Sequence, residues 1–190
     1  FSDEDLALAA IYGEAHRKSD EEDCPLKPLL PVVSDLSLAA DGSLRDARSH
    51  GLELCQHIAV IRFDGPLNYA TIGFFKEAVR ARLLERPALR SLIFAMHAVQ
   101  KIDALAAEEL CDFISGLGKR GLVVGMSGIN DAVMDVLRHS CELGSLCSGN
   151  LFPTQVRAIE AVWETSHEGR EEDPCPLREV VKSSQSDDHR

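Results

Sequence analysis

The segment from Leu89 to Gly118 constrains the fold of this chain most strongly, because two kinds of periodicity follow each other within it. The apolar run over 91–96 has the length of a buried strand, and a short loop over 97–101 follows it. Residues 105–117 then repeat apolar side chains at helical spacing, after Asp103, a residue type suited to cap a helix N-terminus. A strand, a tight loop and a capped helix form one βα unit, so the sequence predicts an α/β domain.

Similar units surround this one. Strands are predicted over 53–63 and 122–126, and helices over 69–85, 133–143 with Asp131 as its cap, and 156–163. The short continuous apolar runs are typical of strands buried on both faces in a largely parallel sheet. We therefore expect a sheet of about four to five strands, packed against four to five helices. The expected core positions at helical spacing are Ile72, Phe75, Val79, Leu83, Leu84, Leu105, Leu110, Phe113, Ile114, Leu117, Val133, Val136, Leu137, Val156, Ile159, Val162 and Trp163.

The regions flanking these units differ from them in charge. The net charge of −11 comes from the flanks, since residues 57–163 carry equal numbers of basic and acidic side chains. Residues 1–51 read as an acidic lead, with a helix over 2–16, a linker over 20–31 and a loop with one short helical turn over 34–49. Residues 164–190 read as a disordered acidic tail. A neutral domain with acidic flanks lacks the basic surface that nucleic acid requires, so nucleic acid is excluded as a partner.

The order of several short motifs resembles the STAS domain, in particular that of SulP anion transporters. The motifs are Arg62-Phe63-Asp64-Gly65-Pro66-Leu67 at a strand exit, Ile102-Asp103-Ala104 at a helix start, Lys119-Arg120-Gly121 at a helix end, and Leu151-Phe152-Pro153-Thr154 before the last helix. The resemblance covers residues 52–163 and implies a STAS-like α/β fold. In STAS domains that act as anti-sigma-factor antagonists, a Ser or Thr follows the Asp and is phosphorylated. Ala104 stands at this position and has no hydroxyl group to accept a phosphoryl group.

The resemblance implies a surface for a protein partner at the turn before the central helix. Its expected residues are His97, Gln100, Lys101, Asp103, Ala104 and Leu105. A purely structural role as a helix cap is the simpler explanation of Asp103, because it requires no further assumption. A second candidate is a ligand loop at Ser127, Gly128 and Asn130, where backbone amides could hold an anion such as a nucleotide phosphate, although the charge of Asp131 opposes this.

Catalytic and metal-binding patterns are absent from the sequence. The six cysteines form no CxxC pair, and His139, Cys141 and Cys147 fit no common zinc-ligand spacing. We find no nucleophile elbow and no paired carboxylates in an apolar setting. The sequence therefore predicts a protein that is not an enzyme and has no metal site or cofactor.

The resemblance to SulP-type STAS domains implies that this chain is the cytoplasmic regulatory domain of a sulfate or anion transporter. Its expected partners are the membrane domain of the same polypeptide, a second copy of the chain, or a cytosolic protein. Because the chain begins at Phe1 and holds no apolar stretch of about 20 residues, we expect it to be a fragment whose membrane part lies upstream. Two alternatives remain, a free-standing STAS signalling protein without a phosphosite and a weak nucleotide-sensing module. An initiator Met directly upstream would favour the first, and nucleotide binding would favour the second.

Overall fold

A six-stranded sheet forms the centre of the molecule. The computed structural model describes residues 31–140, 150–170 and 174–187, so the helix expected over 2–16 lies outside the described residues. The strand order is β2-β1-β3-β4-β5-β6. Strands β3 to β6 are mutually parallel, whereas β1 runs antiparallel to both β2 and β3. The strands are β1 (Val32–Leu38), β2 (Leu44–Asp46), β3 (Ile58–Asp64), β4 (Ser91–Ala95), β5 (Val123–Ser127) and β6 (Leu151–Phe152).

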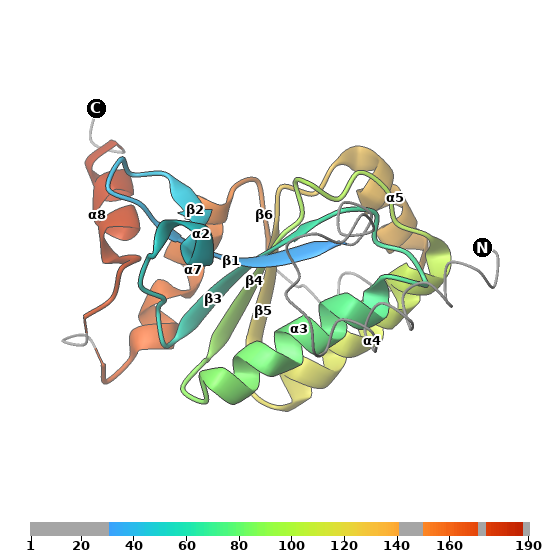
Figure 1. Ribbon diagram of the computed structural model, residues 1–190, viewed down its shortest axis with the longest axis horizontal. Coiled ribbons are helices and arrows are strands. Elements are labelled where there is room, and N and C mark those ends of the chain that lie inside the picture. The colour runs from blue at the N-terminus through green and yellow to red at the C-terminus, as the bar shows by residue number, and fades with distance from the viewer. Residues whose placement is uncertain (1–30, 141–149, 171–173, 188–190) are drawn as a thin grey trace, which may run out of the picture.

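Helices cover both faces of this sheet, as Figure 1 shows. Helices α3, α4 and α5 lie on one face, and α7 and α8 lie on the other. The helices are α2 (Ala47–His50), α3 (Ile72–Glu85), α4 (Ala104–Lys119), α5 (Asp131–Ser140), α7 (Gln155–His167) and α8 (Arg178–Asp187). The α/β class is thus confirmed, with slightly more strands than the four to five expected.

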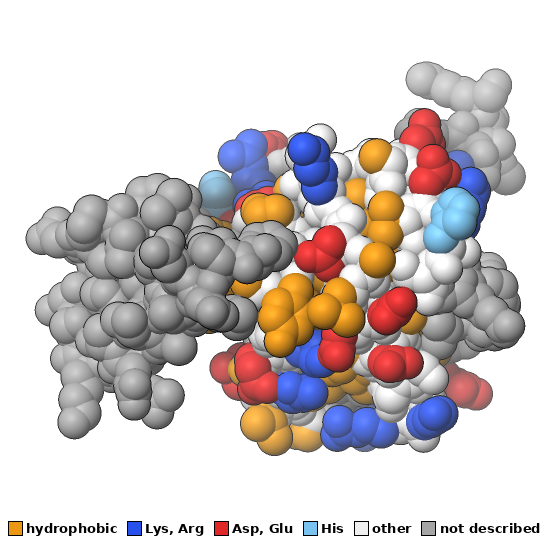
Figure 2. Space-filling model, turned by 90° about the vertical axis from the view of Figure 1, so that its right-hand side faces the viewer, with side chains coloured by type: hydrophobic (Ala, Val, Ile, Leu, Met, Phe, Trp, Pro, Cys, Tyr) orange, Lys and Arg blue, Asp and Glu red, His pale blue; other side chains and the backbone are white. Residues whose placement is uncertain are grey.

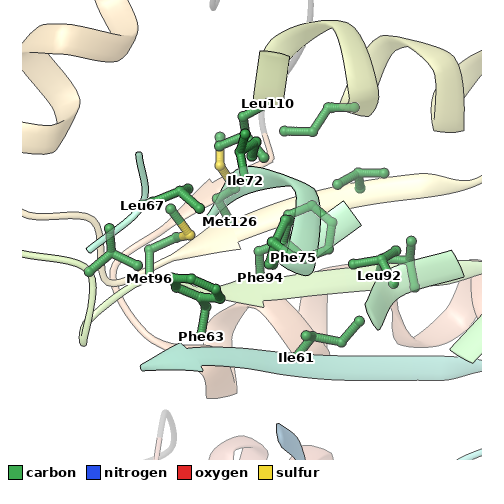
Figure 3. Close-up of a cluster of buried hydrophobic side chains, with 14 of the residues drawn as sticks. Ile61, Phe63, Leu67, Ile72, Phe75, Leu92, Phe94, Met96, Leu110 and Met126 are labelled. Carbon is green, nitrogen blue, oxygen red and sulfur yellow. The ribbon is translucent and has the colours of Figure 1, made fainter. Parts of the chain in front are cut away.

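Alternation along the central strands divides the core into two layers. Ile61, Phe94 and their same-face neighbours pack beneath α3 and α4, whereas Val60 and Ile93 point to α7 and α8. In the first layer the ring of Phe75 meets two strand phenylalanines edge to face, with centroid distances of 5.7 Å to Phe63 and 4.9 Å to Phe94 (Figure 3). Burial of both faces explains why these strands read as continuous apolar runs.

Strand β1 corrects the expectation of a loop over 34–49. Its polar residues, Ser34, Asp35 and Ser37, hide the strand pattern from a reading of the sequence. Asp35 forms ion pairs with Arg82, at 2.6 Å, and with Arg86, both at the end of α3. The partners that make a charged residue acceptable in this strand lie some fifty residues away, so no local pattern reports them. The short helical turn expected in this region is α2.

Several boundaries and core positions also differ from the sequence-based expectation. The third strand begins at Ile58 rather than at residue 53. Leu105, Leu84 and Val156 were expected in the core but are exposed by 47%, 84% and 37%. Asn130, not Asp131, caps α5, because its Oδ1 accepts from the backbone N–H of Val133 at 2.9 Å.

The described part of the segment expected to be a disordered tail, residues 164–170 and 174–187, includes helical structure that packs on the sheet. Helix α7 continues to His167, and α8 occupies 178–187. Leu177 and Val180 are buried in the second core layer beside Leu36 and Val60. Only two buried apolar side chains anchor the described segment, too few to produce a clear amphipathic pattern in a charged sequence.

Candidate functional site

The four parallel strands end at one edge of the sheet, and the loops that follow them form a continuous surface, called here the carboxyl rim. The rim consists of loops 65–71, 96–103, 128–130 and 153–154, together with Ala104 and Leu105 at the start of α4. Figure 2 views the side of the molecule at the right of Figure 1, where α3 and α4 begin, and shows hydrophobic side chains among acidic and basic ones. The carboxyl edge of a parallel sheet is where α/β proteins usually place binding residues.

Asp103 joins two loops of the rim. Its Oδ1 accepts from the backbone N–H of Ala106 at 2.7 Å and so caps α4. Its Oδ2 accepts from the backbone N–H of Tyr69 at 3.0 Å, in the loop that leads to α3. The carboxylate is therefore a cap, as the structural reading of the sequence expected, and it also holds the neighbouring loop in place.

Backbone and side-chain hydrogen bonds fix the central loop of the rim from both sides. The N–H of Leu67 donates to the carbonyl of Lys101 at 3.2 Å, and Asn130 Nδ2 donates to the carbonyl of Val99 at 2.9 Å. The His97 ring contacts Gln155 Nε2 through Nδ1 at 2.9 Å. A loop held in this way presents its outward side chains in one arrangement.

The structure brings the six expected partner-surface residues together on the rim. His97, Gln100, Lys101, Ala104 and Leu105 are exposed, and Asp103 is half-buried. Tyr69 was not expected in this surface, but its side chain is 48% exposed and its backbone binds Asp103. Little in the sequence pointed to Tyr69, because it is 34 residues away from Asp103 and only the folded structure brings the two loops together.

The residues of the expected ligand loop are largely engaged by the protein itself. Asn130 uses its amide oxygen on Val133 and its amide nitrogen on Val99. Ser127 is fully buried, and its hydroxyl has no hydrogen-bond partner among the described residues. Gly128 adopts a φ of +67°, and a Cβ there would lie 3.2 Å from the Cβ of His97. The three residues thus shape the turn after β5.

A groove of about 450 Å³ lies beside the rim, between the β1–β2 hairpin and the start of α7. The residues that line it include His97, Gly128, Gln155, Leu36 and Val180. Arg62 also lines it, but this guanidinium is paired with Asp64 at 2.8 Å. The two side chains share one face of β3, and they neutralise each other there.

A second cluster of functional side chains lies at the opposite end of the strands. Cys55, His167 and Cys175 each place one potential ligand atom within 4.8 Å of the other two. Sequence reasoning missed this cluster because Cys55 and His167 are 112 residues apart. Of the zinc candidates considered from the sequence, Cys141 and Cys147 lie outside the described residues.

Comparison with known proteins agrees with this fold. The family model of the STAS domain matches residues 52–158, and the chain therefore belongs to the STAS domain family. No protein with a curated description matched the sequence. Among the described residues, no helix has both the length and the apolar character needed to cross a membrane.

Solved structures with the same fold include transporter proteins. The murine Solute Carrier 26 family member A9 anion transporter, in its inward-facing state, is 19% identical with a TM-score of 0.61, over 69% of this chain and 22% of that one. A sulfate transporter family protein from Wolinella succinogenes is 21% identical with a TM-score of 0.52, over 65% of this chain and 99% of that one. The anti-sigma factor antagonist SpoIIAA, in its unphosphorylated form, is 16% identical with a TM-score of 0.48, over 58% and 92%. This chain spans about a quarter or less of the full-length transporters that it matches.

Proposed function

We propose that this chain is the cytoplasmic regulatory STAS domain of a SulP-type anion transporter and that its carboxyl rim docks on the membrane domain of the same polypeptide. The observation that carries the proposal is the rim itself. Its loops are cross-linked by Asp103 and Asn130, and it exposes Tyr69, in one of these loops, and Leu105, in the first turn of α4. Large exposed apolar side chains on a rigid support are typical of a protein interface.

The extent of the structural similarity supports a tethered domain. The chain aligns with about a fifth of an anion transporter, so a larger part of that polypeptide has no counterpart here. The docking role requires no catalytic step and no cofactor. Regulation would act through the contact between the two parts, by stabilising one transport state over another.

The side chain at position 104 supports docking without control by phosphorylation. Ala104 is exposed at the first position of α4, where its methyl group offers no acceptor for a phosphoryl group. Control by a kinase at this turn would require a hydroxyl-bearing residue.

Transport by the complete polypeptide tests the proposal. The first step is to sequence the coding region upstream of Phe1, which should encode apolar membrane spans of about 20 residues each. In the full-length protein, Leu105→Asp places a charge in the proposed contact and should lower anion uptake at equal surface expression. Leu84→Asp is the matched control, because Leu84 is also exposed but lies near the far end of α3, away from the rim.

Two outcomes would contradict the proposal. One is an initiator Met within a few codons of Phe1, which would make the chain a free-standing STAS protein. The other is equal anion uptake by the Leu105→Asp and Leu84→Asp variants, which would show that the rim takes no part in the regulatory contact.

A further inference from the structure

The cluster of Cys55, His167 and Cys175 lies on the α7–α8 face, far along the strands from the carboxyl rim. It joins the loop before β3, the last residue of α7 and the segment before α8. Cys55 and His167 are buried and Cys175 is half-buried. The distance between Cys55 Sγ and His167 Nε2 is 3.6 Å. Three potential ligands from three separate segments thus converge on one point.

The surroundings of His167 direct one nitrogen into the cluster. Its Nδ1 lies 3.1 Å from the carbonyl oxygen of Trp163, which can only accept, so Nδ1 carries the proton and donates. The Nε2 lone pair then faces Cys55. The Trp163 ring stacks on the imidazole at a centroid distance of 4.0 Å and fixes its orientation. A histidine held through its other nitrogen by a carbonyl is the usual arrangement of a metal ligand.

The surroundings of Cys55 favour a thiolate. Its sulfur accepts from the backbone N–H groups of His57, at 3.4 Å, and Ile58, at 3.3 Å. Two N–H donors that point at one sulfur atom favour its negatively charged form, the thiolate. The thiolate form is the one that binds metals.

We propose that Cys55, His167 and Cys175 bind a single Zn²⁺ ion, with a water molecule or another small ligand at the fourth position. Zinc is bound at about 2.3 Å from sulfur and about 2.0–2.1 Å from nitrogen, and a tetrahedral angle then separates the two ligand atoms by about 3.6 Å. The distance between Cys55 Sγ and His167 Nε2 has this value before any adjustment. This inference does not depend on the docking role of the carboxyl rim.

Charge balance also suits a zinc ion at this buried position. Two thiolates and a neutral imidazole carry two negative charges, which one divalent cation cancels. A neutral assembly avoids the large desolvation cost of an unpaired buried charge. The partial exposure of Cys175 leaves a path for the ion and space for the fourth ligand.

Zinc at this site would anchor the C-terminal segment to the sheet. Cys175 stands two residues before Leu177, which directly precedes α8, and five before Val180 of α8; both are buried in the second core layer. Val180 also lines the groove beside the rim. The ion would therefore add a third attachment for a segment that otherwise depends on few buried contacts.

Cobalt titration of the reduced chain tests the site. Co²⁺ in a tetrahedral thiolate site gives visible d–d bands and a near-ultraviolet sulfur-to-cobalt band. The expected result is one Co²⁺ per chain with both features, displaced by stoichiometric Zn²⁺. Cys175→Ser should lower the Zn²⁺ affinity more than about 100-fold. Loss of a group that only hydrogen-bonds to a metal ligand already costs about 10–100-fold, and loss of the ligand itself should cost more. His167→Gln should do the same.

Controls separate this site from the other cysteines. Cys147→Ser should leave the cobalt spectrum and the Zn²⁺ affinity unchanged. Cys175 is substituted rather than Cys55 because Cys55 is buried, and a Cys55→Ser variant could lose zinc binding simply by failing to fold. Hydrogen exchange in 174–182 should slow when Zn²⁺ is added to the wild type and stay unchanged in Cys175→Ser.

Three results would overturn the proposal. The first is a cobalt spectrum without a sulfur-to-cobalt band. The second is a spectrum lost in Cys147→Ser and kept in Cys175→Ser. The third is a reduced chain that takes up no Zn²⁺ while the untreated chain has a Cys55–Cys175 disulfide by peptide mass mapping, which would make the pair a disulfide.

Discussion

At the scale of the residue, Asp103 is the clearest case of one side chain with two structural tasks. One carboxylate oxygen caps α4 and the other holds the loop before α3. Asp103→Ala removes both bonds, so we expect the free energy of unfolding to fall by about 1–2 kcal/mol. Asp103→Asn keeps one acceptor oxygen and should lose less. Urea denaturation followed by circular dichroism measures the stability of both variants. An unchanged midpoint for Asp103→Ala would contradict the stabilising role of the two Asp103 hydrogen bonds.

Asp46 predicts a pH dependence of stability. The backbone N–H of Ser49, 2.6 Å away, lowers the pKa of this carboxyl below its usual value. A depressed pKa in the folded state means that the carboxylate stabilises the fold above about pH 4 and that this contribution fades as the pH falls further. Asp46→Asn can still cap α2 but does not titrate. The melting temperatures of the two proteins should therefore converge, or cross, as the pH falls from about 5 to about 3; a difference independent of pH would contradict the prediction.

At the scale of the element, an ion cluster fastens strand β1 to helix α3. Asp35 accepts from both Arg82 and Arg86, and all three side chains are at most 15% exposed. Asp35→Ala leaves two guanidinium groups short of their partner, so we expect a loss of about 3–5 kcal/mol in the free energy of unfolding.

The control for this variant lies on α3 itself. Glu77 pairs with Arg80 on the helix surface, where both side chains are well exposed. Glu77→Ala should therefore change stability by no more than about 0.5 kcal/mol. Equal effects of Asp35→Ala and Glu77→Ala in guanidinium chloride titrations would show that the cluster does not hold β1.

Helix α8 depends on a small number of apolar contacts. Leu177 is 1% exposed, and Leu177→Ala should lower the free energy of unfolding by about 2–4 kcal/mol. Leu84→Ala removes the same atoms from a leucine that is 84% exposed and should cost less than about 0.5 kcal/mol. Thermal melts of the two variants give the comparison. A Leu177→Ala variant as stable as Leu84→Ala would mean that the segment is not packed on the sheet in solution.

At the scale of the whole molecule, stability and docking should be separable. Tyr69 and Leu105 are about half exposed and contribute little to the core. The double variant Tyr69→Ala/Leu105→Ala should change the free energy of unfolding by no more than about 0.5 kcal/mol per substitution, because substitutions at exposed positions usually have small effects on stability. In the complete polypeptide the same variant should lower anion uptake. A large loss of stability would instead show that these two side chains stabilise the folded domain.

The two ends of the parallel strands carry different groups of side chains. The carboxyl rim presents exposed side chains on loops joined by Asp103 and Asn130. The opposite end gathers Cys55, His167 and Cys175, which the inferred zinc ion would join. Helix α8 lies between them, since Cys175 precedes it and Val180 lines the groove near the rim. Zinc that anchors α8 would therefore also stabilise the position of Val180 in the groove, and the hydrogen-exchange experiment over 174–182 would detect this.

The sequence by itself determined the central βα units, the Asp103 cap and the class of the fold. These features rest on local rules, since the apolar period of a strand or helix and the chemistry of a cap appear within a few residues. It also placed the six residues of the expected partner surface next to one another, because they lie within residues 97–105, in one loop and at the start of α4. Only the tertiary structure decided the remaining features. Strand β1 needs Arg82 and Arg86 to neutralise Asp35, and Leu105 falls outside the core because of where α4 lies on the sheet. The Cys55–His167–Cys175 cluster joins residues 112 and 8 positions apart along the chain, and no sequence period spans such a distance.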